Sequence, residues 1–204
     1  MNVFNKGEII RHLESHKIWI ETVGKMGSKL AADEVDFRNI DLTSYPLDQA
    51  YLTACTFDGM NLFKKDLFAS VICSSTFEDA NLENADFYKA DASYANFMNA
   101  NLQNARFARS DCIETVFLGA DLRNVTLVDA LFYQTDFRDA NLQNADVSTS
   151  TFEEVLLKGA KLEGINSLEE DFIKSINVGT PEDPIVFIGE EARQWLSNNS
   201  SINE

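Results

Sequence analysis

Apolar residues recur at every fifth position along most of the chain, from Phe37 to Leu162, without one insertion. Two residues before most of them lies a smaller residue, usually Ala and elsewhere Ser, Thr, Val or Cys. The three remaining positions of each unit are largely polar. Helices repeat every 3.6 residues and strands every two, so neither keeps one face in register with this pattern. The pattern predicts short units that each point one large and one small residue inward.

The large residues also repeat over a longer distance, because positions 20 apart carry the same type of side chain. One column is phenylalanine and the next is leucine, whereas the other two columns mix large and small residues. The predicted core of the two uniform columns is Phe37, Phe57, Phe77, Phe97, Phe117, Phe137, Leu42, Leu62, Leu82, Leu102, Leu122 and Leu142. This segregation predicts square coils of four units, stacked at the ~4.8 Å spacing of paired strands.

The units ANLEN, ADFYK, ANFMN, ANLQN and ADLRN resemble the A(D/N)LXX repeat of the pentapeptide-repeat family. The resemblance covers about residues 30–165. It implies an all-β solenoid, a right-handed quadrilateral β-helix in which four units form one coil. Because each coil contacts only its neighbours, both ends of such a stack need a cap.

Residues 1–29 are expected to form the N-terminal cap and its loop. Apolar residues such as Ile9 and Leu13 lie at near-helical spacing, which predicts a helix from about residue 6 to 22. Gly24 and Gly27 then end the helix. An atypical first unit centred on Ala32 is expected to follow.

Residues 166–204 are expected to form a C-terminal cap or dimerisation segment. Phe172 is predicted to fill a last partial coil, and the two prolines of GTPEDP end the pattern. The stretch IVFIGEEARQWLSNN predicts a short amphipathic helical element, which either caps the rod or joins two rods into a homodimer. The last seven residues are expected to be disordered.

The charge balance limits the classes of partner. The 33 acidic and 17 basic residues give a formal charge of −16, which disfavours direct binding to nucleic acid or to a membrane and favours a basic protein. No apolar run approaches the roughly 20 residues of a membrane-spanning helix, and the N-terminal residues do not resemble a signal peptide. Cys55, Cys73 and Cys112 lack metal or redox spacing, so we expect ordinary thiols and a cytoplasmic protein.

The sequence contains no pattern that predicts a catalytic, cofactor or metal site. His12 and His16 lie one helical turn apart, but partly buried imidazoles in the capping helix are the favoured interpretation. Lys65 occupies an inward position, where an unpaired ammonium is costly; we expect a local irregularity or an outward-reaching side chain. A filled prism is expected to offer no substrate pocket, so the protein is not expected to be an enzyme.

Outward apolar and acidic residues gather on the third and fourth faces of the predicted prism, and no Lys or Arg accompanies them on the fourth. Clustered exposed apolar residues indicate a contact surface, although outward strand positions also favour aromatic and branched residues by themselves. The candidate interaction surface comprises Tyr51, Phe68, Val71, Tyr88, Asp91, Tyr94, Asp111, Ile113, Leu131 and Tyr133.

Two functions are compatible with these features. The first is a non-enzymatic scaffold whose rigid acidic and aromatic wall docks a protein partner. The second follows from resemblance to the quinolone-resistance branch of the family, which implies a dimeric mimic of DNA that binds a type II topoisomerase. Basic residues on the other three faces dilute the acidic surface that the second function requires.

Overall fold

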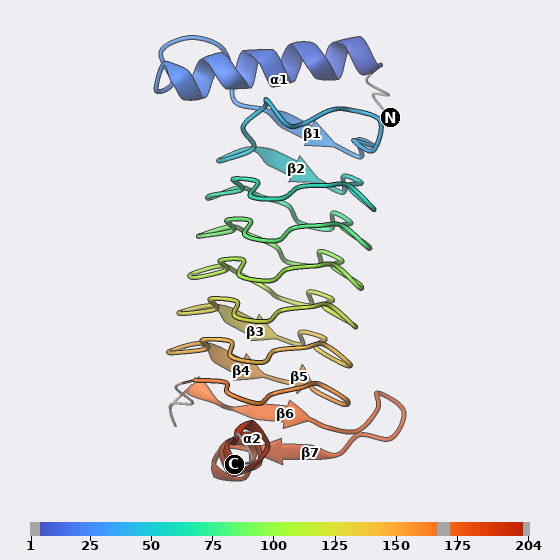
Figure 1. Ribbon diagram of the computed structural model, residues 1–204, viewed down its shortest axis with the longest axis vertical. Coiled ribbons are helices and arrows are strands. Elements are labelled where there is room, and N and C mark those ends of the chain that lie inside the picture. The colour runs from blue at the N-terminus through green and yellow to red at the C-terminus, as the bar shows by residue number, and fades with distance from the viewer. Residues whose placement is uncertain (1–4, 167–171, 202–204) are drawn as a thin grey trace.

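The computed structural model of the 204-residue chain describes residues 5–166 and 172–201. Stacked coils form a rod, with the helix α1 lying across one end and the helix α2 beside the last strands at the other (Figure 1). None of the described helices is long and apolar enough to cross a membrane.

Helix α1 (Lys6–Glu21) begins and ends within one residue of the predicted bounds. Its N-terminus has a capping box: the Asn5 side chain accepts the backbone N–H of Glu8, and the Glu8 carboxylate accepts that of Asn5. Its inner face buries Ile9, Leu13 and His16. The helix therefore covers apolar side chains that an open coil would expose.

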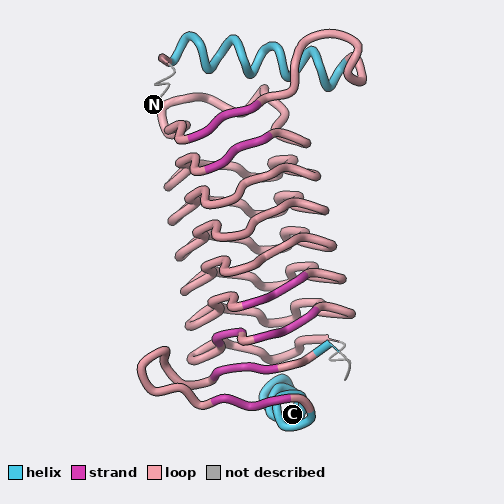
Figure 2. Tube along the Cα trace, turned by 180° about the vertical axis from the view of Figure 1, so that it is seen from behind, coloured by secondary structure: helices cyan, strands magenta, loops and turns pink. Residues whose placement is uncertain are grey.

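The coils pair in parallel with a shift of 20 residues, as Asn61 with Asn81 and Asn81 with Asn101. The longest paired segments are β1 (Ala31–Asp33) with β2 (Tyr51–Thr53), and β3 (Leu131–Tyr133) with β4 (Thr151–Glu153). Elsewhere a turn follows almost every paired residue, so Figure 2 shows loop between the strands. The predicted β-solenoid is thus built mainly from single paired positions rather than from continuous sheets.

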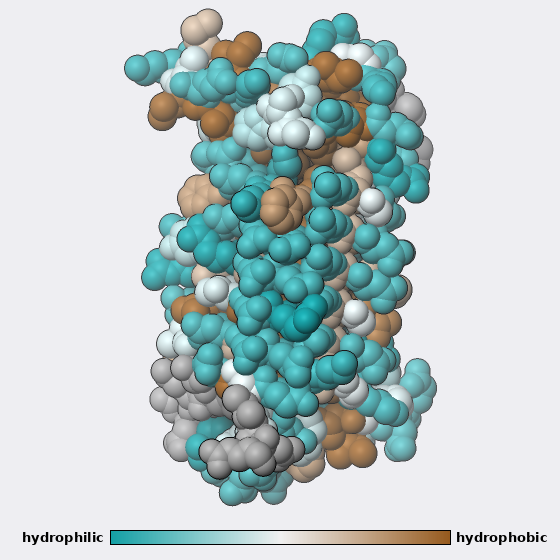
Figure 3. Space-filling model, viewed as in Figure 1, coloured by the Kyte–Doolittle hydropathy of each residue, from teal (hydrophilic) through white to brown (hydrophobic). Residues whose placement is uncertain are grey.

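The phenylalanine column confirms the twenty-residue coil. The ring centroids of Phe77 and Phe97 lie 4.9 Å apart with an interplanar angle of 10°, and Phe97 and Phe117 follow at 5.2 Å. All twelve predicted core residues of the two uniform columns are buried. Polar side chains point outward, so the face in Figure 3 is mostly hydrophilic between two ends where hydrophobic side chains gather.

The first coil begins at Ala32, as predicted: Ala32 is buried and lies opposite Leu52. The last coil differs from the prediction, because Phe152 pairs with Ile173 rather than with Phe172. Ile173 is buried, whereas Phe172 is only partly buried. One residue is therefore added to the twenty-residue spacing at the end of the array.

The C-terminal segment closes the rod. The strands β5 (Val155–Leu156), β6 (Ser175–Asn177) and β7 (Val186–Ile188) form a sheet in which β7 is antiparallel and at the edge. The Asn177 side chain accepts the N–H groups of Gly179 and Ile185, which fixes the turn between β6 and β7.

Helix α2 (Glu190–Ser200) follows β7 and buries Ala192 and Leu196. It includes residues 198–200, so the prediction of seven disordered terminal residues is wrong there because the helix continues. Residues 202–204 lie outside the described residues.

Candidate interaction surface

The structure places half of the candidate surface in one ladder on the fourth wall. Tyr51, Val71, Asp91, Asp111 and Leu131 pair in succession along five adjacent coils. Each occupies the outward position before an inward residue, so their side chains share one wall of the rod. The fold therefore brings apolar and acidic groups from 80 residues of sequence into a single strip.

The other candidates flank this strip or lie around its corner. Tyr94 and Ile113 occupy turns of the same wall and Tyr133 ends β3 on it, whereas Phe68 and Tyr88 stack on the third wall with ring centroids 5.9 Å apart. Of all ten candidates, only Tyr51, Tyr94 and Asp111 are well exposed, and the other seven are half-buried. Part of the predicted apolar surface is thus used for packing between coils.

Cations from the same chain cover two of the aromatic rings. The Arg106 guanidinium lies 4.5 Å from the ring centroid of Tyr88, and the Lys29 ammonium lies 4.4 Å from that of Tyr51. Such contacts stabilise the rings where they lie. Tyr94 is 54 % exposed, which leaves it as the aromatic side chain most open to a partner.

The fourth wall of the array differs from the other three in carrying no arginine. On the other three walls, each of five arginines forms an ion pair with an aspartate: Arg38–Asp36, Arg106–Asp86, Arg109–Asp129, Arg123–Asp121 and Arg138–Asp136. Among the described residues, Asp91, Asp111 and Glu114 form no ion pair. Burial, followed by the neighbouring Asp91 carboxylate, raises the pKa of Asp111. On the same wall Glu153 pairs with Lys174, but a cation brought to Asp91, Asp111 and Glu114 would meet negative charge that no ion pair with the described residues neutralises.

Lys65 resolves an irregularity in the first coil. Its ammonium donates to the carbonyl oxygens of Leu42 at 2.7 Å and Tyr45 at 3.2 Å. Within the described residues, Asp41 and Pro46 have no paired residue 20 positions on, so the ladder starts one coil later on these two walls. Burial lowers the pKa of Lys65. The Lys65 side chain thus donates to carbonyl groups of the preceding coil. The predicted local irregularity lies at this position.

His16 joins α1 to the array instead of binding a metal. Its Nδ1 accepts the N–H of Leu30 at 3.1 Å, so the proton is on Nε2, which lies 3.1 Å from the Asp48 carbonyl oxygen. The side chain is fully buried, and burial lowers its pKa. Both ring nitrogens are occupied by these contacts.

The described residues contain no group of three His, Cys, Asp or Glu placed to hold a metal. The three cysteines are free, and burial raises the pKa of Cys55 to about 11 and those of Cys73 and Cys112 to about 12. The thiols are therefore protonated at neutral pH, and reactive thiolate chemistry is disfavoured.

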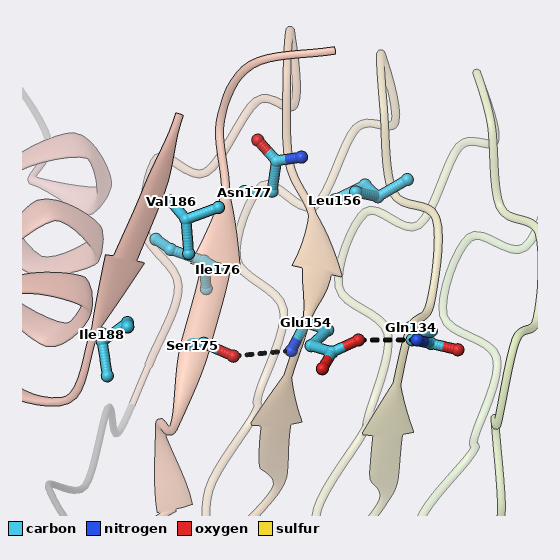
Figure 4. Close-up of a pocket in the computed structure, with 8 residues that line it drawn as sticks. All are labelled: Gln134, Glu154, Leu156, Ser175, Ile176, Asn177, Val186 and Ile188. Atoms are coloured by element: carbon cyan, nitrogen blue, oxygen red, sulfur yellow. Dashed lines mark hydrogen bonds between the residues drawn. The ribbon is translucent and has the colours of Figure 1, made fainter. Parts of the chain in front are cut away.

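The sequence did not predict a hollow beside the terminal sheet, and the expectation that the rod has no concavity is wrong at this end. We call this feature the hollow; its volume is about 530 Å³. It is lined by Gln134, Glu154, Leu156, Ser175, Ile176, Asn177, Val186 and Ile188. Figure 4 shows Gln134, Glu154 and Ser175 in a hydrogen-bonded row along one side. The hollow exists because β7 turns back beside the last coil, which the five-residue pattern does not encode.

Solved structures with a similar fold are all distant from this chain. Rfr23, a pentapeptide repeat protein from the cyanobacterium Cyanothece 51142, is 18 % identical, with a TM-score of 0.31, over 55 % of this chain and 83 % of its own. HetL, involved in heterocyst differentiation regulation in Nostoc sp. strain PCC 7120, is 17 % identical, with a TM-score of 0.32, over 82 % and 96 %. QnrB1, a plasmid-mediated fluoroquinolone resistance protein, is 15 % identical, with a TM-score of 0.34, over 73 % and 92 %.

A comparison with curated protein sequences gives no match. Two family models do match: one described as a pentapeptide repeat region covers residues 93–166, and one described as pentapeptide repeats (8 copies) covers residues 66–104. The same unit continues outside these segments, from Phe37 to Leu162, in coils that pair 20 residues apart. The repeat region of this chain, residues 66–166, therefore matches the pentapeptide-repeat family that its units resemble.

Proposed function

We propose that the protein is a non-enzymatic scaffold whose fourth wall docks a basic protein partner. The observation that carries this proposal is that the fourth wall has no arginine: the five arginines of the array pair with aspartates on the other walls, while Asp91, Asp111 and Glu114 form no ion pair with the described residues. The exposed ring of Tyr94 lies on the same wall. A wall with charge and one open aromatic side chain suits a partner with lysines or arginines around an apolar residue.

Each part of the wall has a separate role in this proposal. The carboxylates steer a positively charged partner and set its orientation, whereas Tyr94 supplies apolar contact area. The wall is held by backbone hydrogen bonds to the coils on both sides, as where the Asp91 N–H donates to the Ser70 carbonyl and the Ala92 N–H donates to the Asp111 carbonyl. A rigid wall loses little conformational freedom on binding, which favours affinity. The free, protonated thiols support a reducing, cytoplasmic location.

The test compares variants of opposite walls in a pull-down from source cells. The double variant Asp91→Lys/Asp111→Lys reverses the charge of the fourth wall, and Asn101→Lys/Asn141→Lys adds the same lysines to the second wall. We expect the partner to bind the wild type and the control equally well. Its affinity for the fourth-wall variant should be lower by at least about tenfold. Equal recovery with both variants would assign binding to another surface.

A DNA-mimicking inhibitor of a type II topoisomerase is the alternative, favoured by the formal charge of −16. The arginine–aspartate pairs weaken it, because they neutralise charge on three walls. Binding of the purified protein to gyrase, with and without competing DNA, separates the two functions. Gyrase binding that DNA competes away would support DNA mimicry. If the protein does not bind gyrase, the scaffold function remains the proposal.

A further inference from the structure

Exposed large apolar side chains gather at the two ends of the rod. Six of the nine such residues in the described chain lie there, and Figure 3 shows the same contrast between the ends and the wall. At the N-terminal end they are Ile18, Val23 and Met26, and at the C-terminal end Ile185, Val186 and Ile188. Apolar groups left open at both ends, on a rod that is otherwise polar outside, indicate contact surfaces.

The N-terminal group is presented by a fixed loop, residues 22–27, which we call the tip. The Thr22 hydroxyl donates to the Ile18 carbonyl and accepts the N–H of Met26 at 3.0 Å. Gly27 has φ +74°, and a Cβ there would lie 2.2 Å from the Ser15 carbonyl oxygen, so the loop packs tightly against α1. The tip projects past the edge of the first coils (Figure 1).

Val23 combines an unfavourable backbone conformation with a highly exposed side chain. Its φ is +51°, the left-handed region that a β-branched residue rarely adopts. Every other described non-glycine residue with positive φ lies at the repeated turn position of a five-residue unit. Val23 is nevertheless 87 % exposed, so this strain is not offset by burial within the chain.

The hollow at the other end is large and apolar enough to receive the tip. Its apolar lining includes Leu156, Ile176, Val186 and Ile188. At about 530 Å³ it is larger than the roughly 150 Å³ cavity that holds a benzene-sized group, so two aliphatic side chains fit. The side chains of Val23 and Met26 have this character and size.

The two ends are also complementary in charge. Residues 1–29 contain five basic and three acidic residues, a formal charge of +2. Because the whole chain has a formal charge of −16, residues 30–204 carry −18. Lys25 lies in the tip; its backbone N–H donates to the Thr22 carbonyl oxygen, whereas its ammonium forms no hydrogen bond or ion pair with the described residues. Glu154, on the rim of the hollow, accepts a hydrogen bond from Gln134 but has no cation beside it among the described residues.

We propose that rods associate head to tail: the tip of one copy inserts Val23 and Met26 into the hollow of the next, with Lys25 beside Glu154. The contact joins two different surfaces, so it extends into an open chain instead of closing at two copies. The C-terminal segment therefore takes part in self-association, but its mate is the N-terminal tip and not a second C-terminal segment. Such chains would repeat the fourth wall and raise the avidity for a multivalent partner.

The first test measures mass against concentration by light scattering, over a range that covers dissociation constants of about 1 μM to 1 mM. We expect the wild-type mass to rise through dimers to longer species. Met26→Glu at the tip and Ile188→Glu in the hollow should each weaken association by about tenfold or more. Ile185→Glu is the control, because Ile185 is equally exposed but does not line the hollow, and it should associate like the wild type.

Mixing the two variants gives the decisive result. Met26→Glu keeps an intact hollow and Ile188→Glu an intact tip, so together they should form a one-to-one dimer that grows no further. Reversing one charge, as in Glu154→Lys, should weaken association, and adding Lys25→Glu to the same chain should restore it. Recovery in either experiment also shows that the variants are folded.

Two outcomes would overturn the proposal. If Met26→Glu still self-associates like the wild type while Ile188→Glu does not, the contact is a two-fold one between C-terminal segments. If the wild type stays monomeric over the whole concentration range, the ends do not join. Both outcomes leave the fourth-wall proposal intact, since that is tested with different variants.

Discussion

At the scale of single residues, inward side chains carry the stability of the rod. Phe97 stacks between Phe77 and Phe117 and is fully buried, whereas Asn101 points outward. Phe97→Ala should lower the free energy of unfolding by about 3 to 5 kcal/mol, because it leaves a cavity in the column. Asn101→Ala should cost about 1 kcal/mol, because it removes two partly solvated hydrogen bonds: the one that the side chain donates to Asn81 and the one that it accepts from the Gln103 N–H. Chemical denaturation checks both, and equal effects would contradict the inward and outward assignment.

His16 predicts a pH dependence at the same scale. Burial lowers its pKa in the folded protein below the ordinary value of about 6.5, so between these two values the unfolded chain binds more protons. The stabilisation is complete above about pH 6.5 and declines as the pH falls toward the folded pKa. Denaturation of the wild type and His16→Gln from pH 5 to 8 should show a stability difference that grows with pH. A constant difference would mean that His16 does not titrate on unfolding.

At the scale of elements, each coil is stabilised by its neighbouring coils, and the C-terminal end is stabilised by the side chain of Asn177. Asn177 holds the turn between β6 and β7, and its carbonyl accepts the N–H of Leu157 in the coil before it. Asn177→Ala leaves the Gly179 and Ile185 N–H groups without this acceptor, at a cost of about 1 to 3 kcal/mol. Coils of a repeat protein interact mainly with their neighbours, so the effect should stay near this end.

Hydrogen exchange measures this local effect. In Asn177→Ala the amide of Leu157 should exchange faster, while that of Phe97, which donates to Val116 in the middle of the rod, should not change. Asn141→Ala, an outward change on another wall, is the control and should alter neither. Equal acceleration at both amides would show that the rod unfolds as one unit.

At the scale of the whole molecule, the walls and the ends have separate tasks. Asp91, Asp111 and Glu114 on the fourth wall form no ion pair with the described residues, and six of the nine exposed large apolar side chains described lie at the two ends. The elements at the two ends, α1 and the C-terminal segment, cover backbone groups of the terminal coils. This limits strand pairing between the ends of different molecules. The reversed-charge wall variants and the mixed end variants therefore test independent properties of one rod.

The sequence by itself determined the twenty-residue coil and the inward or outward direction of each residue in the array. It did so because every unit repeats the same local geometry. Phe37 and Phe137, for example, occupy equivalent inward positions in the same column. It also placed the ten candidate surface residues on two adjoining walls. It did not show that Arg106 and Lys29 cover two of their rings, since these contacts join coils.

Only the tertiary structure decided what happens where the repeat stops. Ile173 takes the place predicted for Phe172, Lys65 bonds to carbonyls of the preceding coil, and β7 folds back to form the hollow. Each of these depends on a contact made once, between residues distant in the chain, and no period in the sequence records it. A repeated pattern encodes the coil, whereas the ends are set by which unpaired groups the last coils leave to be satisfied.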